Sequence, residues 1–178
     1  MSHADTKTTF KGSVWIRPTG VAMDRVQQAI WQVHKRVGGP PVKAHVSLLG
    51  GLDLPPENAE ARLTGLVSGL KPFEIRLGRI EWRPEYYRCL FVAVEPSEQL
   101  LAAHVAAHEA FERPLPDTFE PHVSLLYGDI EESLKKQLAS ELGGAVETEF
   151  TATAVDLVNA TENVPIAQWS TFKAAKIG

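Results

Sequence analysis

The pentapeptide His45-Val46-Ser47-Leu48-Leu49 recurs unchanged as His122-Val123-Ser124-Leu125-Leu126 in this 178-residue chain. Aliphatic residues alternating with polar ones are typical of a β-strand, in which residues i and i+2 point to the same face. His45 is therefore expected to share a face with Ser47, and His122 with Ser124. Each copy predicts a strand that presents an imidazole and a hydroxyl side by side, with aliphatic side chains packed behind them.

The two copies are separated by 77 positions, and the same offset relates Phe73 to Phe150 and Trp15 to Val92. Hydrophobic periodicity predicts strands and helices in the same order on both sides of residue 85. The expected strands are 12–17, 44–49, 73–82 with a bulge near Gly78, 88–95, 121–126, 149–158 and 166–172. The expected helices are 21–37, 55–70, 97–111 and 130–142, the last capped by Asp129 or Ser133.

Shared order and shared spacing indicate an internal duplication, with halves at about 12–82 and 88–174 of a single domain that spans 1–178. We expect an α+β fold in which two antiparallel sheets flank a central cleft and the helices lie outside. A pseudo-twofold relation would place equivalent residues of the two halves opposite one another across that cleft.

Two histidine–serine pairs that face each other suit phosphoryl transfer. One imidazole can take a proton from water while the other protonates the leaving oxygen, and the two hydroxyls can bind the phosphate oxygens. A single His-x-Ser on a strand is usually incidental, and packing alone could preserve the aliphatic positions. Packing gives no reason to keep His45, Ser47, His122 and Ser124, so we predict these four as the site, without metal or cofactor.

The bulk composition limits the partners. The net charge of −4 argues against binding to long nucleic acid, whereas a small anion could be bound by local basic residues. The single cysteine, Cys89, fits a reducing compartment, and the polar stretch 1–11 lacks a signal-peptide pattern. We expect a cytoplasmic monomer with a small-molecule substrate and no membrane span.

Two aromatic residues are further candidates for the substrate pocket. Tyr127 directly follows the second motif and could stack on a base or ribose, or simply pack at a strand end. Trp15 shares a strand face with Ser13 and Arg17, so it could form a pocket wall, and a core position is equally compatible with the pattern.

Several charged or metal-binding candidates have simpler interpretations. Lys43, Arg17, Arg88 and Arg113 could contact phosphate, but surface solvation is the commoner fate of a basic residue. His104 and His108 have the i, i+4 spacing of a zinc pair, but no third ligand is evident, so we expect them on a solvated helix face.

The two His-x-Ser motifs resemble the signature of the 2H phosphoesterase superfamily. Within it, the chain is similar to the plant and fungal cyclic phosphodiesterases, through residues 13–15 (Ser-Val-Trp), 45–47, 87–91 (Tyr-Arg-Cys-Leu-Phe) and 121–128 (Pro-His-Val-Ser-Leu-Leu-Tyr-Gly). The resemblance covers about 12–172. It departs at Ser47, where relatives often have threonine, and in the single cysteine, so no disulfide-dependent behaviour is carried over.

The resemblance implies hydrolysis of ADP-ribose 1″,2″-cyclic phosphate to ADP-ribose 1″-phosphate and of nucleoside 2′,3′-cyclic phosphates to 2′-phosphates, with Tyr127 at the mouth of the site. Two alternatives remain open. One is an RNA 2′,3′-cyclic phosphodiesterase or 2′-5′ RNA ligase, for which a basic groove would be expected. The other is a non-catalytic nucleotide-binding module, against which the four intact motif positions argue.

Overall fold

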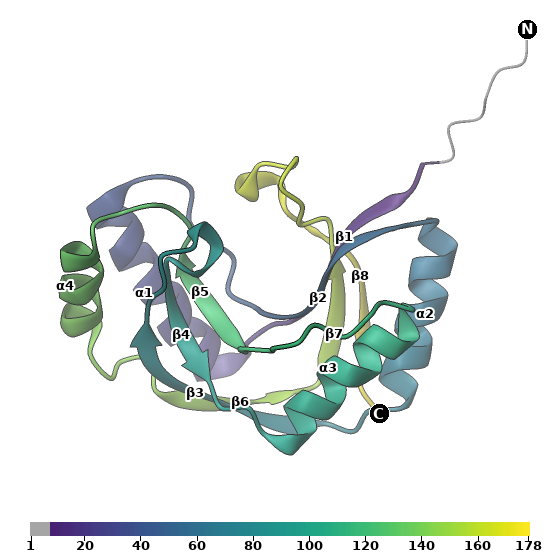
Figure 1. Cartoon of the computed structure of the whole chain (residues 1–178). Helices are drawn as coiled ribbons and strands as arrows, with labels where there is room; N and C mark the ends of the chain where they lie inside the picture. The colour runs from purple at the N-terminus through teal and green to yellow at the C-terminus, as the bar shows by residue number, and fades with distance from the viewer. Residues whose placement is uncertain (1–7) are drawn as a thin grey trace, which may run out of the picture.

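A computed structural model describes residues 8–178, so the first seven residues of the polar stretch 1–11 lie outside the described part (Figure 1). The α+β class is confirmed. The strands are β1 (Phe10–Ile16), β2 (Val46–Leu54), β3 (Phe73–Glu81), β4 (Leu90–Val94), β5 (His122–Leu126), β6 (Thr148–Ala152), β7 (Ala154–Val158) and β8 (Thr171–Lys176). The helices are α1 (Gly20–Val37), α2 (Pro56–Ser68), α3 (Glu98–Ala110) and α4 (Glu132–Leu142), with short 3₁₀ turns η1 (Tyr86–Arg88) and η2 (Ile166–Gln168).

All strands belong to one curled antiparallel sheet, in the order β6-β3-β4-β5-β2-β1-β7-β8. The two sheets expected from the sequence are therefore joined. They meet between β2 and β5 at a single pair, Val46 with Val123, which are the residues that follow the two histidines. Because pairing stops after this bridge, the two halves of the sheet diverge on either side of it (Figure 1).

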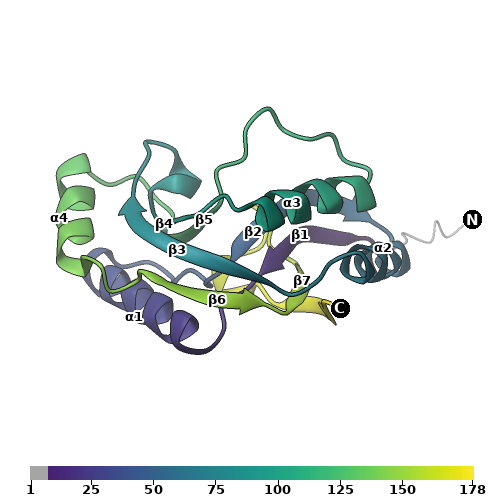
Figure 2. The same ribbon diagram turned by 90° about the horizontal axis from the view of Figure 1, so that it is seen from below.

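Elements from both halves of the chain build each half of the sheet. Strands β1 and β2 lie beside β7 and β8, whereas β3 lies between β4 and β6. Helix α1 packs against β5 and β6, and helix α3 packs against β2 and β3. Figure 2 shows β3 and β6 running side by side across the face that joins the two groups of helices. The strand order is symmetric about the β2–β5 bridge. Strand β2 corresponds to β5, β1 to β4, and β7 to β3.

Two of the expected elements differ from the structure. The predicted strand 149–158 is two strands separated at Thr153, because β6 pairs with β3 while β7 pairs with β1 near the opposite end of the sheet. The alternating apolar pattern continues through this break and conceals it. The predicted strand 166–172 begins instead at Thr171, after the turn η2.

Helix capping and the bulge can also be compared with expectation. Helix α4 begins after Glu131 without a side-chain cap, so neither Asp129 nor Ser133 caps it. Ser97 caps α3, since its hydroxyl accepts from the Leu100 amide at 3.2 Å. The bulge near Gly78 is confirmed by the register shift between Leu77 and Ile80 in the β3–β4 pair.

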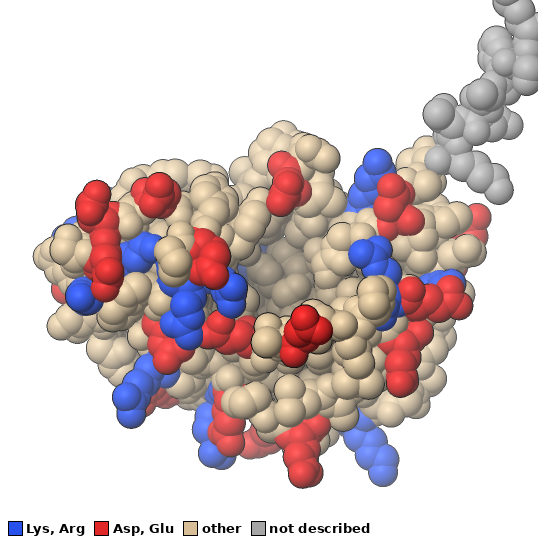
Figure 3. Space-filling view, in the orientation of Figure 1, with Lys and Arg blue, Asp and Glu red and all other residues tan. Residues whose placement is uncertain are grey.

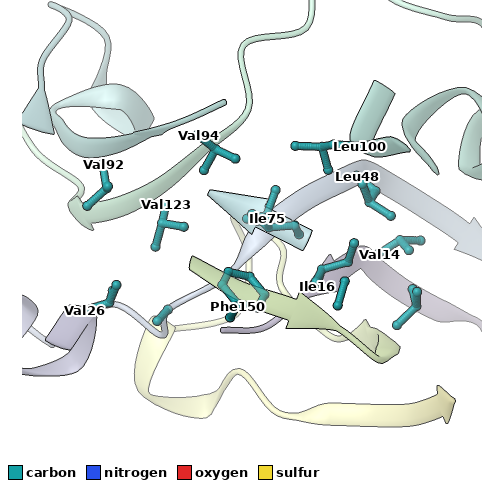
Figure 4. Packing of buried hydrophobic residues seen from close by; sticks show 14 of the residues in the cluster. Val14, Ile16, Val26, Leu48, Ile75, Val92, Val94, Leu100, Val123 and Phe150 are labelled. Atoms are coloured by element: carbon teal, nitrogen blue, oxygen red, sulfur yellow. The ribbon is translucent and has the colours of Figure 1, made fainter. Parts of the chain in front are cut away.

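The core explains why the histidines face the concave side of the sheet. In β2 and β5 the aliphatic residues of the two motifs, Val46, Leu48, Val123 and Leu125, are fully buried. Figure 4 shows Leu48 and Val123 packed among other core side chains of the sheet and helices. Since neighbouring strand residues point to opposite faces, burying these residues turns the motif's polar residues to the concave face. Within residues 8–178 no helix has the length and apolarity to cross a membrane.

Candidate active site

The concave side of the sheet holds a cavity of about 430 Å³ above the β2–β5 bridge. Its wall includes all six residues predicted from the sequence, namely Trp15, His45, Ser47, His122, Ser124 and Tyr127. The hollow is visible at the centre of Figure 3, with basic side chains on either side of it. The two copies of the motif therefore meet in one cavity, although 77 positions separate them along the chain.

Both imidazoles are held by the same hydrogen bond. Nδ1 of His45 donates to the carbonyl oxygen of Lys43 at 2.6 Å, and Nδ1 of His122 donates to that of Glu120 at 2.7 Å. A carbonyl oxygen can only accept, so the Nδ1 atoms carry hydrogen. The other ring nitrogen, Nε2, is then free in both residues to accept a proton or, when protonated, to donate one.

His45 lies in an apolar environment that disfavours its charge. It is 7% exposed, and the indole of Trp15 stacks on its ring. The pKa of His45 is lowered from 6.5 to about 3, mainly by burial and further by the positive charges of His122 and Arg17, while the hydrogen bond to Lys43 acts in the opposite direction. His45 and His122 line the same cavity.

His122 differs in having a carboxylate nearby. Burial lowers its pKa as well, but the Glu120 carboxylate and the hydrogen bond to the Glu120 carbonyl act in the opposite direction. Glu120 itself binds Arg88 at 2.7 Å and also binds Arg83. The ring of Phe91 lies 5.1 Å from that of His122 at an angle of 58°, so it covers His122 less closely than Trp15 covers His45.

The two serines have unequal surroundings. Ser124 is buried and its hydroxyl donates to the carbonyl oxygen of Tyr87 at 3.3 Å. Ser47 is half-buried, and within residues 8–178 its hydroxyl makes no hydrogen bond, which leaves it available to a ligand. A third hydroxyl in the cavity wall, from Ser13, donates to the Ala160 carbonyl at 3.2 Å.

Aromatic rings form one wall of the cavity. Tyr127 lies 5.1 Å from Tyr87 and 6.0 Å from Trp169, measured between ring centroids. Burial raises the pKa of Tyr127 to about 12, so its phenol stays neutral and can donate a hydrogen bond. Trp15 is both a pocket wall and a core residue, since it is 1% exposed and also packs against Trp169 at 5.9 Å.

Trp169 was not anticipated from the sequence. It lies after η2 in the segment that follows β7, which stands above the hollow (the yellow loop in Figure 1). Its indole nitrogen donates to the Val164 carbonyl at 2.8 Å within the same segment, and Trp169 lines the cavity. An isolated tryptophan in an irregular segment carries no periodic pattern, so no signal in the sequence singles it out.

The basic candidates are mostly engaged elsewhere. Arg17 pairs with Asp156 at 3.0 Å, and Arg88 pairs with Glu120. The ammonium group of Lys43 binds the Trp169 carbonyl. Arg113 donates to the Gly51 carbonyl at 2.9 Å, at the rim of the cavity.

The expectation that His104 and His108 lie on a solvated helix face is wrong. Both are buried because α3 packs against β2 and the chain that follows α3 folds back over it. His104 donates to the Leu48 carbonyl at 2.9 Å and stacks on Phe119, while His108 donates to the Pro114 carbonyl at 3.0 Å. Within the part of the chain that the structure describes, no cluster of three or more metal-binding side chains forms.

A curled α+β sheet with paired histidines on its concave face is the architecture of the two-histidine (2H) phosphoesterases, as the resemblance implied. The family model of the 2′-5′ RNA ligase superfamily matches residues 12–163, and the chain belongs to this family. A curated relative, the cyclic phosphodiesterase of Arabidopsis thaliana, is 23% identical over 124 residues, which cover 70% of this chain and 68% of that protein.

Solved structures share the fold. Escherichia coli LigT complexed with 3′-AMP has a TM-score of 0.63 at 13% identity, covering 96% of this chain and 99% of the other. TT0787 of Thermus thermophilus has a TM-score of 0.63 at 18% identity, covering 94% of this chain and 97% of the other. LigT has also been crystallised with ATP and with NADP+. At these identities the likeness concerns the fold.

Proposed function

We propose that this chain hydrolyses small cyclic phosphates, nucleoside 2′,3′-cyclic phosphates and ADP-ribose 1″,2″-cyclic phosphate, without a metal ion. The observation that carries the proposal is the meeting of both His-x-Ser pairs in one cavity, with each histidine offering a free Nε2. Membership of the 2′-5′ RNA ligase superfamily and the relative named cyclic phosphodiesterase support an enzyme of the phosphodiesterase class.

The two histidines act as base and acid in one in-line displacement. Nε2 of the base takes a proton from water, and the water oxygen forms a bond to phosphorus. The bond from phosphorus to one ribose oxygen breaks, and Nε2 of the acid gives that oxygen a proton. Ser47 and Ser124 donate hydrogen bonds to the non-bridging oxygens, where negative charge gathers.

We assign the base to His45 and the acid to His122. His45 lies under Trp15 and near Arg17, so the neutral form that accepts a proton is favoured there. His122 has the Glu120 carboxylate beside it, which favours the protonated form. A bound phosphate anion adds negative charge next to His122 and stabilises its protonated ring further.

The aromatic wall is suited to the rest of the substrate. Trp15, Tyr127 and Trp169 offer flat apolar surface on which a base or ribose can stack. We expect the protein to act as a monomer on small substrates in the reducing environment of the cytoplasm.

The test is a panel of 2′,3′-cyclic mononucleotides and ADP-ribose 1″,2″-cyclic phosphate, with the position of the product phosphate read by phosphorus NMR. Turnover should persist in EDTA, and His45→Ala and His122→Ala should each lower kcat by about 10²- to 10⁴-fold. His34→Ala, on α1 outside the cavity, is the matched control and should retain full activity.

Three results would contradict the proposal. Loss of turnover in EDTA with recovery on adding zinc would replace the metal-free mechanism. Tight binding of AMP without turnover of any cyclic phosphate would indicate a binding module. Cleavage of RNA-terminal cyclic phosphates with neglect of mononucleotides would indicate the RNA-processing alternative.

A further inference from the structure

We propose that Arg113 binds a second phosphate, carried on C5 of the same ribose that bears the cyclic phosphate. The preferred substrates would then be 5′-phosphorylated cyclic phosphates rather than plain nucleoside cyclic phosphates. This inference rests on the proposed function, because it places the cyclic phosphate between His45 and His122.

Arg113 is held at the edge of the candidate active site. Its Nη1 donates to the carbonyl oxygen of Gly51 at 2.9 Å, and its Nη2 lies 3.8 Å from the point where a Cβ atom on Gly51 would be. Gly51 lines the main cavity. A second cavity of about 410 Å³ has Arg113 in its wall and shares Ser47 and Gly50 with the first. The two cavities are therefore neighbours along β2, and the guanidinium group in the wall of the second is bonded to Gly51 in the wall of the first.

The local backbone opens this rim. Between Gly12 and Val14 the register of β1 and β2 shifts, so that Ser13 faces the pair Gly50 and Gly51 in a β-bulge. Gly51 has a φ of +67°, a conformation that glycine adopts without strain. Because neither glycine has a side chain, no side chain from these two positions separates the guanidinium group from the main cavity.

The charge of Arg113 is uncompensated. Within residues 8–178 no carboxylate lies within 4.0 Å of its guanidinium group. The neighbouring carboxylate, Glu112, is instead bound to Arg62 at 2.9 Å. Arg17 and Arg88, which lie nearer to the histidines, are each paired with a carboxylate. A positioned guanidinium group without a carboxylate partner is a strong donor to phosphate.

The shape of the substrate fits this arrangement. In a 2′,3′-cyclic nucleotide the base on C1 and the substituent on C5 leave the ribose in different directions. If the base stacks on the wall formed by Trp15, Tyr127 and Trp169, the C5 substituent is free to extend along Gly50 and Gly51 toward Arg113. Both 5′-phosphorylated nucleotides and the pyrophosphate-linked ribose of ADP-ribose cyclic phosphate carry a phosphate there.

The experiment compares kcat/KM for adenosine 2′,3′-cyclic phosphate with and without a 5′-phosphate, and includes ADP-ribose 1″,2″-cyclic phosphate as a separate arm. The wild-type protein should prefer the 5′-phosphorylated nucleotide at least about tenfold, and rising salt should reduce this preference. Arg113→Gln should abolish the preference and leave the plain nucleotide unaffected, while Arg113→Lys should retain part of it. Arg25→Gln is the control, an exposed arginine on α1 away from both cavities.

An unchanged preference in Arg113→Gln, or equal use of both nucleotides by the wild-type protein, would overturn the inference and leave the proposed function intact. If no cyclic phosphate is turned over, the proposed function fails. Calorimetry then tests Arg113 alone, by comparing adenosine 2′,5′-bisphosphate with adenosine 2′-phosphate. Tighter binding of the bisphosphate that is lost in Arg113→Gln would support the phosphate site, and equal binding would refute it. If Arg113→Gln lowers kcat/KM for only one of the two substrates, the 5′-phosphorylated nucleotide or ADP-ribose 1″,2″-cyclic phosphate, that substrate identifies the class that the site serves.

Discussion

The indole of Trp15 lies flat on the imidazole of His45, with ring centroids 3.4 Å apart and planes inclined by only 6°. In the other half of the site Phe91 takes the equivalent position, since Phe91 pairs with Ser124 as Trp15 pairs with Ser47. Phe91, however, is tilted by 58° against His122. This difference between two otherwise matched positions is a physical reason for unequal proton affinities of the two histidines.

Trp15→Ala should expose one face of His45 and raise its pKa from about 3 toward the ordinary 6.5. The loss of a buried tryptophan should also lower the free energy of unfolding by about 3–5 kcal/mol. Trp15→Phe should shift the pKa less, because a ring remains over the imidazole. NMR titration of the His45 ring and urea unfolding measure both effects, and Trp31→Ala on the exposed side of α1 is the control. If the pKa of His45 is unchanged in Trp15→Ala, the indole is not what lowers it.

The pH profile of kcat/KM should be bell-shaped and displaced to the acidic side of 6.5. Activity rises with pH as His45 loses its proton, near pH 3, and falls again as His122 loses its proton at a pKa below 6.5. Because the Glu120 carboxylate raises the pKa of His122, Glu120→Gln should move the alkaline limb to still lower pH.

Glu85→Gln is the matched control for that experiment, since Glu85 also binds Arg88, at 2.9 Å, but is not among the groups that shift the pKa of His122. An alkaline limb that stays in place in Glu120→Gln, or moves to higher pH, would reverse the assignment of His122 as the acid.

Variants of the two serines should have similar effects on turnover but different effects on the stability of the fold. Ser47→Ala and Ser124→Ala should each lower kcat by about 10²- to 10³-fold, as the loss of a donor to the developing charge does elsewhere. Only Ser124→Ala should also reduce stability, by about 1 kcal/mol, because its hydroxyl bonds the Tyr87 carbonyl. Ser47→Thr keeps the hydroxyl and should remain active. Unimpaired turnover in Ser47→Ala would exclude that hydroxyl from the reaction.

The same substitution, glycine to alanine, should have opposite effects on stability at Gly12 and at Gly65. A Cβ atom on Gly12 would lie 1.9 Å from the carbonyl oxygen of Val158, because β1 and β7 approach closely there. Gly12→Ala should therefore force the strands apart and destabilise the protein severely. Gly65, inside α2, has nothing within 4 Å of that point, and Gly65→Ala should stabilise the protein by about 0.5–1 kcal/mol. Thermal unfolding of both variants checks this, and a stable Gly12→Ala would show that β7 can move.

The repeated pentapeptide allowed most of the arrangement to be predicted from the sequence. Strand alternation is a local property, so the direction of His45, Ser47, His122 and Ser124 follows from their neighbours, and one cavity collects all four. The α+β class and the bulge at Gly78 follow from periodicity in the same way.

What the sequence could not reveal depends on contacts between distant segments. The burial of His104 and His108 is caused by a chain segment that folds back over α3, including Pro114 and Phe119. The offset of 77 aligned Trp15 with Val92, whereas strand pairing makes Phe91 its counterpart, because the chain from Trp15 to its partner Ser47 is one residue shorter than the chain from Phe91 to Ser124. The place of Trp169 likewise depends on how an irregular segment lies over the sheet.

The exchange of strands between the two halves of the sheet has a consequence for how the molecule could be divided. Cutting the chain near residue 85 would produce two fragments, each lacking a strand that only the other supplies: β7 beside β1, and β3 beside β4. Each fragment alone would leave an unpaired edge and much of its apolar surface in water. Neither could become a smaller working unit, but the two fragments mixed together should reassemble by complementation, each restoring the other's missing strand.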